Sequence, residues 1–288
     1  MKLSLKAPAK INLGLSIVGK GLNNYHEVKT IYTQISLFDL IELEDINEER
    51  IEIMCNWPEI PVDRKNLIWK AASLVKDKYK IKKGLRIKLL KKIPVGTGLG
   101  GGSSDAASVL KGLNTLWQLN LDKKKLVEIG KKIGADVAYH VEGGVKLEIQ
   151  GGDKAGKFSD LGRLPKCYIV IGLINKTRIS KQAYQEIDYT QINKNDLSKL
   201  IKAIENKDFK LIGENLYNDF ENWTCKHYPE VKEIKKQMIE GGAVGALMSG
   251  KGLTVFSIFN NRRKAKAVLE RLKTDDNKVY LVVPYYED

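Results

Sequence analysis

The sequence predicts an α+β fold, and three observations lead to that class. Strand-like and helix-like segments do not alternate strictly along the chain, as they would in a doubly wound α/β protein. The last part of the chain has the order strand, helix, strand, strand, helix, strand, which is typical of a ferredoxin-like domain. A polar break rich in glycine, aspartate and lysine falls at residues 151–165. A chain of 288 residues can hold two domains, and we expect them at residues 1–158 and 159–288.

The first elements are predicted as strands, because apolar and polar residues alternate in them. Leu3–Leu5 and Ile11–Ile17 predict a first pair of strands, Thr30–Leu43 predicts a long strand, and Ile51–Met54 predicts its short partner. Asn66–Val75 has apolar residues at helical spacing and predicts an amphipathic helix.

The later elements follow from the same two periodicities. A strand at Leu85–Leu89 precedes a helix that includes Ala106–Leu113, and a lysine-rich helix that starts near Asp122 ends at Gly134. The remaining predicted elements are strands at Val145–Ile149 and Cys167–Leu173, helices within 180–240, strands at 244–248 and 253–259, a helix at 261–273 and a strand at 278–283.

The segment Ile93–Asp105 is the most informative part of the chain, because five glycines fall within seven of its residues. It joins a predicted strand to a predicted helix, with Ser103 or Ser104 expected as the N-cap and Asp105 in the first turn. Glycines allow close approach of the backbone to a ligand, and a helix N-terminus offers unpaired N–H groups. Together these features predict a phosphate-binding loop.

Two better-known phosphate loops fit less well. Gly96, Gly98 and Gly101 satisfy the dinucleotide fingerprint, but Asp122, at the spacing of its acidic residue, starts a helix instead of ending a strand. Gly245–Lys251 resembles a P-loop, but Gly252 replaces the hydroxyl residue that would bind Mg²⁺. An apolar strand-like run follows, so this second glycine segment is predicted to be a hairpin.

Composition limits the class of protein further. The formal net charge of +14 suits an anionic partner, and most lysines are expected on solvated helix faces. Three cysteines and three histidines, scattered without a C-x-x-C pair, predict neither a disulfide framework nor a metal site. No apolar run is long enough to span a bilayer, and the N-terminus lacks a signal-peptide pattern, so a cytoplasmic protein is expected.

Two ionisable residues stand out as candidates for chemistry. Lys10 and Asn12 lie two residues apart on a predicted strand and therefore share one face. Lys10 is either a solvated lysine of an edge strand or a buried cation that meets an anion. Asp136 follows a helix end, so it is either the N-cap of the next helix or a carboxylate aimed at a substrate hydroxyl.

The chain resembles the GHMP kinases along its whole length. The motifs that carry the resemblance are Ala7–Leu13, Asn24–Glu27, Pro94–Ala107, Gly134–Val137 and Gly242–Gly250. The resemblance implies a two-domain fold with an S5 domain 2-like N-terminal part and a ferredoxin-like C-terminal part. It implies ATP and Mg²⁺ as cofactors, a small-molecule substrate, and a monomer or weak homodimer.

The pairing of Pro-Ala-Lys-Ile-Asn with Tyr-His points to one activity within the superfamily. It implies phosphorylation of the 2-hydroxyl of 4-diphosphocytidyl-2-C-methyl-D-erythritol in non-mevalonate isoprenoid precursor biosynthesis. The alternatives are a GHMP kinase for another small alcohol, of homoserine or mevalonate type, and a non-catalytic basic relative that binds nucleic acid.

The resemblance also implies roles for individual residues. Asp136 would be the catalytic base and Lys10 its charged neighbour. Asn12 would orient the substrate, Tyr25 and His26 would line the cytidine pocket, and Tyr184 would stack on the cytosine. The residues expected to hold the ATP phosphates are Pro94, Val95, Gly96, Thr97, Gly98, Leu99, Gly100, Gly101, Gly102, Ser103 and Ser104.

The chain departs from the family pattern at a few positions near these motifs. Ala138 and His140 stand where Pro and Phe are usual, and Lys251 and Leu253 stand where a small residue and Pro are usual. Residues 151–154 also differ from the usual Gly-Arg-Gly-Glu-like end. These departures concern the rim of the pocket and leave Lys10, Asp136 and the main glycine loop in place.

Overall fold

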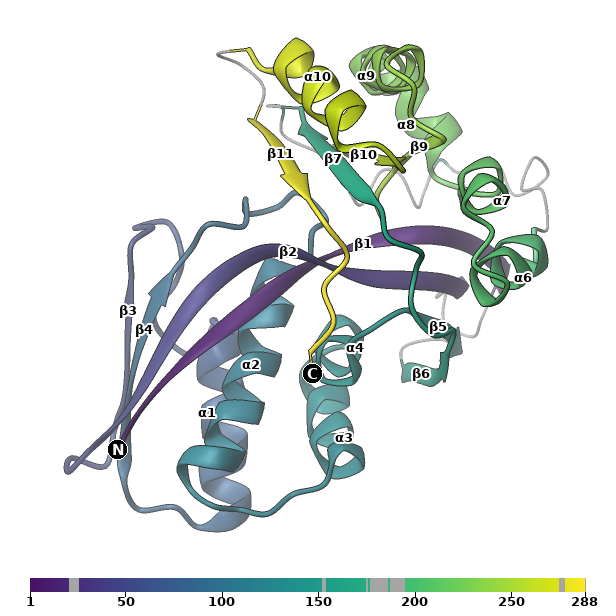
Figure 1. Cartoon of the computed structure of the whole chain (residues 1–288). Coiled ribbons are helices and arrows are strands. Elements are labelled where there is room, and N and C mark those ends of the chain that lie inside the picture. Colours follow the sequence, from purple (N-terminus) through teal and green to yellow (C-terminus); the bar gives the residue numbers. More distant parts are fainter. Residues whose placement is uncertain are drawn as a thin grey trace. The chain divides into compact units, whose positions relative to one another are not determined.

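The computed structural model confirms a mixed α+β fold (Figure 1). It describes residues 1–20, 26–151, 154–174, 176, 186, 195–274 and 278–287. The chain forms two compact units. Unit 1 comprises Met1–Ala9, Leu37–Val95 and Gly100–Gly143, and unit 2 comprises Lys10–Ser36, Gly96–Leu99 and Gly144–Asp288. The two units therefore interleave along the chain, and the predicted domains at 1–158 and 159–288 stay a prediction.

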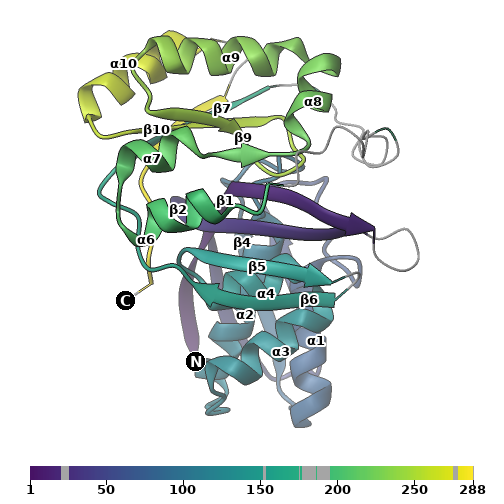
Figure 2. The same cartoon turned by 90° about the vertical axis from the view of Figure 1, so that its right-hand side faces the viewer.

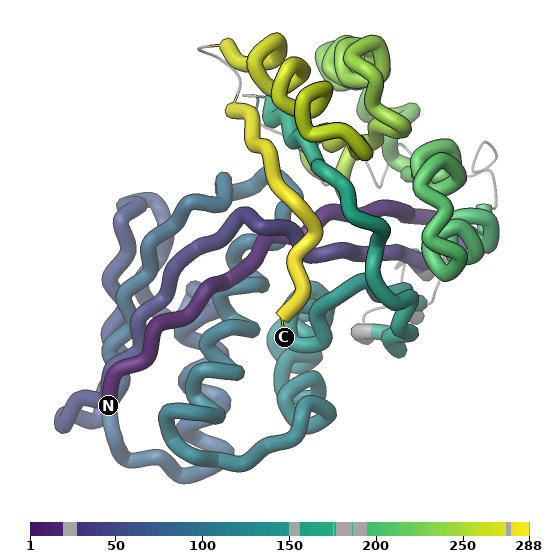
Figure 3. The backbone as a smooth tube through the Cα atoms, viewed as in Figure 1, coloured from purple at the N-terminus to yellow at the C-terminus, as the bar shows by residue number. Residues whose placement is uncertain are grey.

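The first strand is longer than expected. In place of a pair of strands, the structure has one continuous strand, β1 (Lys2–Lys20), which Figure 3 shows as a single extended path. Pro8 lies within it and can be accommodated, because β8 (Tyr217–Asn218) pairs with β1 only at Gly14 and Leu15. A proline is tolerated at a strand position where no neighbouring strand needs a hydrogen bond from its backbone nitrogen.

Unit 1 consists of strands covered by helices. Within it, β4 (Gly84–Leu90) pairs in parallel with β3 (Ile51–Cys55) and antiparallel with residues 40–46 of β2 (His26–Ile46). Figure 1 shows α1 and α2 side by side against these strands. The helices of unit 1 are α1 (Leu67–Tyr79), α2 (Gly101–Leu116), α3 (Lys123–Ile133) and α4 (Ala135–Glu142).

Local sequence explains why these helices form and pack. Asn66 caps α1 by accepting a hydrogen bond from the N–H of Ile68, 2.9 Å away, and the buried residues of α1 recur at helical spacing. In α2, Gly112 allows close packing on the sheet. A Cβ added there would lie 2.5 Å from Leu5 Cδ1 and 2.6 Å from Leu43 Cδ1.

The C-terminal part of unit 2 has the predicted ferredoxin-like topology. Its four strands are β7 (Tyr168–Leu173), β9 (Gly245–Met248), β10 (Thr254–Phe259) and β11 (Lys278–Val282). They form an antiparallel sheet in the order β11-β7-β10-β9. In Figure 2, α9 (Pro229–Glu240) and α10 (Arg262–Leu272) lie on the same side of this sheet. The predicted hairpin around Gly250 is the β9–β10 connection.

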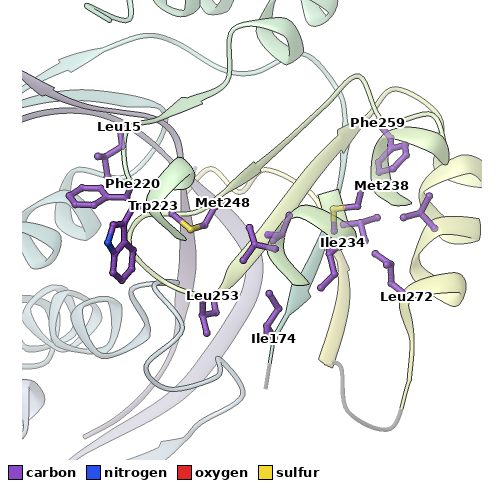
Figure 4. Close-up of a cluster of buried hydrophobic side chains, with 14 of the residues drawn as sticks. Leu15, Ile174, Phe220, Trp223, Ile234, Met238, Met248, Leu253, Phe259 and Leu272 are labelled. Atoms are coloured by element: carbon purple, nitrogen blue, oxygen red, sulfur yellow. The ribbon is translucent and has the colours of Figure 1, made fainter. Parts of the chain in front are cut away.

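Unit 2 contains further elements outside this sheet. They are β5 (Lys146–Gly151), which pairs with β2 and with β6 (Lys154–Asp160), and the helices α6 (Ser198–Glu205), α7 (Phe209–Glu214) and α8 (Glu221–His227). One core joins β1 to the C-terminal sheet and its helices. Figure 4 shows Leu15, Phe220 and Met248 in this cluster, together with Ile234 and Phe259.

Among the residues that the structure describes, no helix is both long enough and apolar enough to cross a membrane.

Candidate active site

Lys10 and Asn12 lie together on β1, as their spacing predicts. Lys10 is 4% exposed and Asn12 is 2% exposed, so the alternative of a solvated edge lysine is wrong. Lys10 Nζ donates a hydrogen bond of 2.8 Å to Asn12 Oδ1 and lies 5.4 Å from the centroid of the Tyr32 ring. The amide oxygen and the aromatic face therefore hold this buried ammonium in position.

Hydrogen bonds fix the Asn12 carboxamide. Asn12 Nδ2 donates to Thr30 Oγ1 at 2.8 Å, and the Thr30 hydroxyl in turn donates to the carbonyl oxygen of Gly14 at 2.9 Å. The backbone N–H of Asn12 donates to Ser249 Oγ at 3.1 Å. Asn12 therefore ties β1 to β2 and to the loop after β9, and its side-chain oxygen faces Lys10.

The two glycine segments meet within unit 2. Lys10 N donates to the carbonyl oxygen of Leu99 at 2.9 Å, and Thr254 Oγ1 donates to that of Thr97 at 2.6 Å. Gly252 lies so close to this segment that an added Cβ would collide with the Thr97 carbonyl oxygen. At Gly98, which has φ +85°, a Cβ would lie 3.2 Å from the Ser249 carbonyl oxygen. Only glycine fits at such positions.

Gly250 completes this arrangement. It has φ +58°, and a Cβ there would lie 3.1 Å from Asn12 Oδ1 and 3.7 Å from Lys10 Nζ. The backbone of the second glycine segment therefore lies directly against the Lys10–Asn12 pair. Three segments far apart in sequence, around residues 10, 98 and 250, form one site in unit 2.

Asn218 holds the second glycine segment in shape, and sequence reasoning missed it. Its Nδ2 donates to the carbonyl oxygens of Met248 and Gly250, both at 2.8 Å, and its Oδ1 accepts from Phe220 N at 3.0 Å. The neighbouring Glu221 accepts from Met248 N at 2.9 Å through Oε1. The run of polar residues around Phe220, just before a helix, was the available signal.

The other part of the main glycine loop begins α2 in unit 1. The prediction of a serine N-cap is wrong, because α2 begins at Gly101 and its N-cap is Gly100, with φ +71° and no side-chain hydrogen bond. Ser103 and Ser104 lie inside the first turn, and Asp105 follows it instead of lying in it. The N–H groups of this turn are therefore not capped by the N-cap side chain. The Ser104 hydroxyl is fully buried and has no hydrogen-bond partner among the described residues.

Asp136 is the second residue of α4, in unit 1. The N-cap of α4 is Gly134, which makes no side-chain capping bond, so the alternative that Asp136 caps this helix is wrong. Asp136 is half-buried and lies in the first turn, where the helix dipole favours a carboxylate.

The predicted cytidine pocket is only partly described. Tyr25 and Tyr184 lie outside the described residues, and His26 is the first residue of β2. Lys251, one of the departures from the family pattern, places its Nζ 5.9 Å from the centroid of the Phe220 ring.

Comparisons with known proteins identify the family of the chain. The family model of the GHMP kinases N terminal domain matches residues 66–146, and that of the GHMP kinases C terminal matches residues 200–278. A protein of Listeria monocytogenes serotype 4b named 4-diphosphocytidyl-2-C-methyl-D-erythritol kinase is 41% identical over 287 residues, which cover 100% of this chain and 97% of the relative.

Solved structures of GHMP kinases share the fold of this chain. A crystal structure of 4-(cytidine 5'-diphospho)-2C-methyl-D-erythritol kinase has a TM-score of 0.83 and 28% identity, over 99% of this chain and 100% of that one. A homoserine kinase from Cytophaga hutchinsonii has a TM-score of 0.80 at 19% identity, over 98% and 95%, which shows a shared fold alone. The chain therefore belongs to the GHMP kinases, in the family of the 4-diphosphocytidyl-2-C-methyl-D-erythritol kinases.

Proposed function

We propose that this chain transfers the γ-phosphoryl group of ATP to the 2-hydroxyl of 4-diphosphocytidyl-2-C-methyl-D-erythritol. The name of the relative that is 41% identical over the whole chain supports this substrate. The observation that carries the proposal is the meeting of Lys10, Gly98 and Gly250, which places a buried ammonium beside the Gly250 backbone, with Gly98 close to the same segment. Phosphoryl transfer depends chiefly on positioning and on stabilising negative charge, and such a site supplies both.

The main glycine loop, residues 94–104, is proposed to hold the ATP phosphates. The support is the absence of a side-chain cap on α2 together with the buried, unpartnered hydroxyl of Ser104. N–H groups at a helix N-terminus bind phosphate oxygens. Lys10 would neutralise charge on the transferring group, and Asn12 would orient the reacting end of the substrate.

Asp136 is proposed as the general base. Its carboxylate would take the proton of the 2-hydroxyl while that oxygen forms a bond to the γ-phosphorus. The bond between the γ-phosphorus and the β,γ-bridging oxygen breaks, and ADP leaves with the electron pair. A half-buried carboxylate in the first turn of a helix suits this role, because the positive end of the helix dipole favours a negative charge there.

Mg²⁺ is proposed to enter as part of the ATP complex. The described residues hold no group of three or more histidines, cysteines, aspartates or glutamates that could form a metal site. Mg²⁺ commonly keeps several waters and binds substrate phosphates. No residue is therefore assigned to the ion and no step depends on one. Tyr25, His26 and Tyr184 remain the proposed cytidine contacts, and a cytoplasmic monomer or weak homodimer remains the expectation.

An ATP-consumption assay across candidate alcohols tests the proposal. The panel contains the cytidine diphosphate-linked alcohol, the same alcohol phosphate without cytidine, homoserine and mevalonate. Turnover restricted to the cytidine-linked substrate is expected. Equal turnover without cytidine would favour the other small-alcohol kinases. Absence of ATP turnover, with nucleic-acid affinity that falls steeply with salt, would favour the basic binding relative.

A further inference from the structure

A second buried lysine, Lys91, forms an ion cluster in unit 1 that the proposed reaction does not use. Lys91 Nζ contacts Asp39 Oδ2 at 2.5 Å and Asp105 Oδ2 at 2.8 Å. All three side chains are at most 3% exposed. Asp39 comes from β2, Lys91 follows β4, and Asp105 belongs to α2, so the cluster joins three elements.

The two carboxyl groups have unequal surroundings. Asp39 Oδ1 also accepts hydrogen bonds from the backbone N–H groups of Lys92, at 2.5 Å, and Ile93, at 2.8 Å. Asp105 Oδ1, by contrast, is buried without a hydrogen-bond partner among the described residues. An ionised carboxylate has about four acceptor positions to satisfy, so the buried Oδ1 without a partner makes ionisation of Asp105 costly. The single positive charge of Lys91 balances the charge of one carboxylate. The other carboxyl group therefore keeps its proton, and we assign that proton to Asp105.

The cluster lies against the turn that is proposed to bind phosphate. A Cβ on Gly101, the first residue of α2, would lie 3.1 Å from Lys91 Nζ and 3.0 Å from Ile93 Cγ2. Asp105 is four residues further along α2, which is about 6 Å along the helix axis. A negative charge on Asp105 would therefore oppose an anion at the uncapped N–H groups of this turn.

We propose that Lys91, Asp39 and Asp105 form a positioning cluster for the first turn of α2, and that this turn accepts the ATP phosphates while Asp105 is uncharged. The inference rests on the proposed function of the loop. It adds that ATP affinity depends on pH through the charge of Asp105. Asp105 touches neither ATP nor the alcohol in this proposal, so it is a positioning residue.

The pKa of Asp105 agrees with the geometry. Burial, opposed by Lys91 and assisted by Asp39, raises it from the ordinary 3.8 to about 8. Burial acts to lower the pKa of Lys91, but Asp105 and Asp39 outweigh it and leave that pKa raised. The helices α1, α3 and α4 pack against α2, yet among the described residues the charges that act on Asp105 are those of Lys91 and Asp39.

The pH effect on stability follows from the sign of this shift. Between pH 3.8 and about 8 the native protein holds a proton on Asp105 that the unfolded chain has lost. The contribution of this group to stability is therefore fully present at low pH and is lost as pH rises through that window. ATP affinity should fall over the upper end, near pH 8, where the native carboxyl itself ionises.

Calorimetry of ATP-Mg²⁺ binding, without alcohol, tests the inference. For the wild type, affinity should fall by about ten- to fiftyfold between pH 7 and 9.5, because one charge about 7 Å from a phosphate near the surface changes affinity by up to about fiftyfold. At pH 8.5, titrations in two buffers of different ionisation enthalpy should show uptake of up to one proton. Asp105→Asn, a neutral near-isostere, should bind ATP at pH 7 within about threefold of wild type and show neither effect.

Asp122→Asn is the matched control. Asp122 caps α3 by accepting from Lys125 N at 2.8 Å, outside the cluster, so this variant should keep the wild-type pH profile. Identical pH profiles and proton uptake in wild type and Asp105→Asn would overturn the inference. If Asp105→Asn does not fold, absence of proton uptake by the wild type at pH 8.5 overturns it alone. A folded wild type that binds no ATP at any pH would instead refute the proposed function.

Discussion

Two buried lysines, Lys10 in unit 2 and Lys91 in unit 1, show how different the surroundings of a buried cation can be. Lys91 contacts two carboxyl groups, one of which also accepts hydrogen bonds from two backbone N–H groups. Lys10 donates to an amide oxygen, lies over an aromatic ring and has the backbone of Gly250 beside it. The first arrangement fixes elements of the fold, and the second surrounds the ammonium with backbone that only glycine permits.

This difference shows that burial alone does not identify a catalytic lysine. The glycines around Lys10 make it the stronger candidate, because backbone that leaves no space for a Cβ can come close to a ligand. The same contrast applies to the acids: Asp105 is buried in the Lys91 cluster, whereas Asp136 is half-buried in the first turn of α4. Matched substitutions of the two acids and of the two lysines test whether the two regions differ in function as they do in surroundings.

The largest effect is expected from Asp136→Asn. It removes the proposed base and keeps the size of the side chain, so turnover should fall by about 10²–10⁴-fold. Calorimetry should show that ATP binding is retained. Asp105→Asn, the same chemical change in the other region, should keep most turnover at pH 7. Normal turnover of a folded Asp136→Asn variant would remove Asp136 from the mechanism.

Lys91→Met should mainly affect stability. It leaves two buried carboxyl groups without their cation, a loss that typically costs about 3–5 kcal/mol. Urea unfolding measures the change in the free energy of unfolding. The double variant Lys91→Met/Asp105→Asn should show nearly the same loss as the single variant, because Asp105 is already uncharged near pH 7. A loss below about 1 kcal/mol for the single variant would contradict a structural role for the cluster.

Lys10→Met should mainly affect catalysis. Removal of one group that stabilises transition-state charge lowers kcat by about 10²–10³-fold. Its described hydrogen bond, to a neutral amide, implies a stability loss of about 1 kcal/mol. Steady-state kinetics and urea unfolding of the same preparation give both numbers. If Lys10→Met instead loses stability as Lys91→Met does and keeps its kcat, the comparison between the two lysines fails.

The smallest effect is expected at Tyr184, the proposed cytosine-stacking residue outside the described part of the chain. Base stacking on an aromatic side chain contributes about 1–3 kcal/mol. Tyr184→Ala should therefore lower kcat/KM for the cytidine-linked substrate by up to about two orders of magnitude, with little change in the KM for ATP. A uridine-linked substrate should be poorer for wild type through lost edge contacts. Equal kcat/KM for the cytidine, uridine and nucleotide-free substrates would rule out a cytidine pocket.

Local sequence determined most of the elements and the main loop. Alternation and helical spacing located β3, β4, α1, α3 and the C-terminal strands, because these periodicities depend only on which face of an element is buried. The ferredoxin-like order followed from the succession of these elements. Glycine density located the loop, and the resemblance of its flanking motifs gave the family.

Only the tertiary structure decided how these segments combine. It made β1 one continuous strand. Pro8 fits within it because β8 pairs with β1 only at Gly14 and Leu15, so that strand needs no backbone N–H from Pro8. It moved the start of α2 to Gly101, because Gly100 adopts positive φ, and so placed the serines inside the turn. The contacts of Asn218 with Met248 and Gly250 span 30 and 32 positions, and that of Lys91 with Asp39 spans 52. Sequence separation carries no information about such contacts, because folding alone brings these side chains within hydrogen-bond distance.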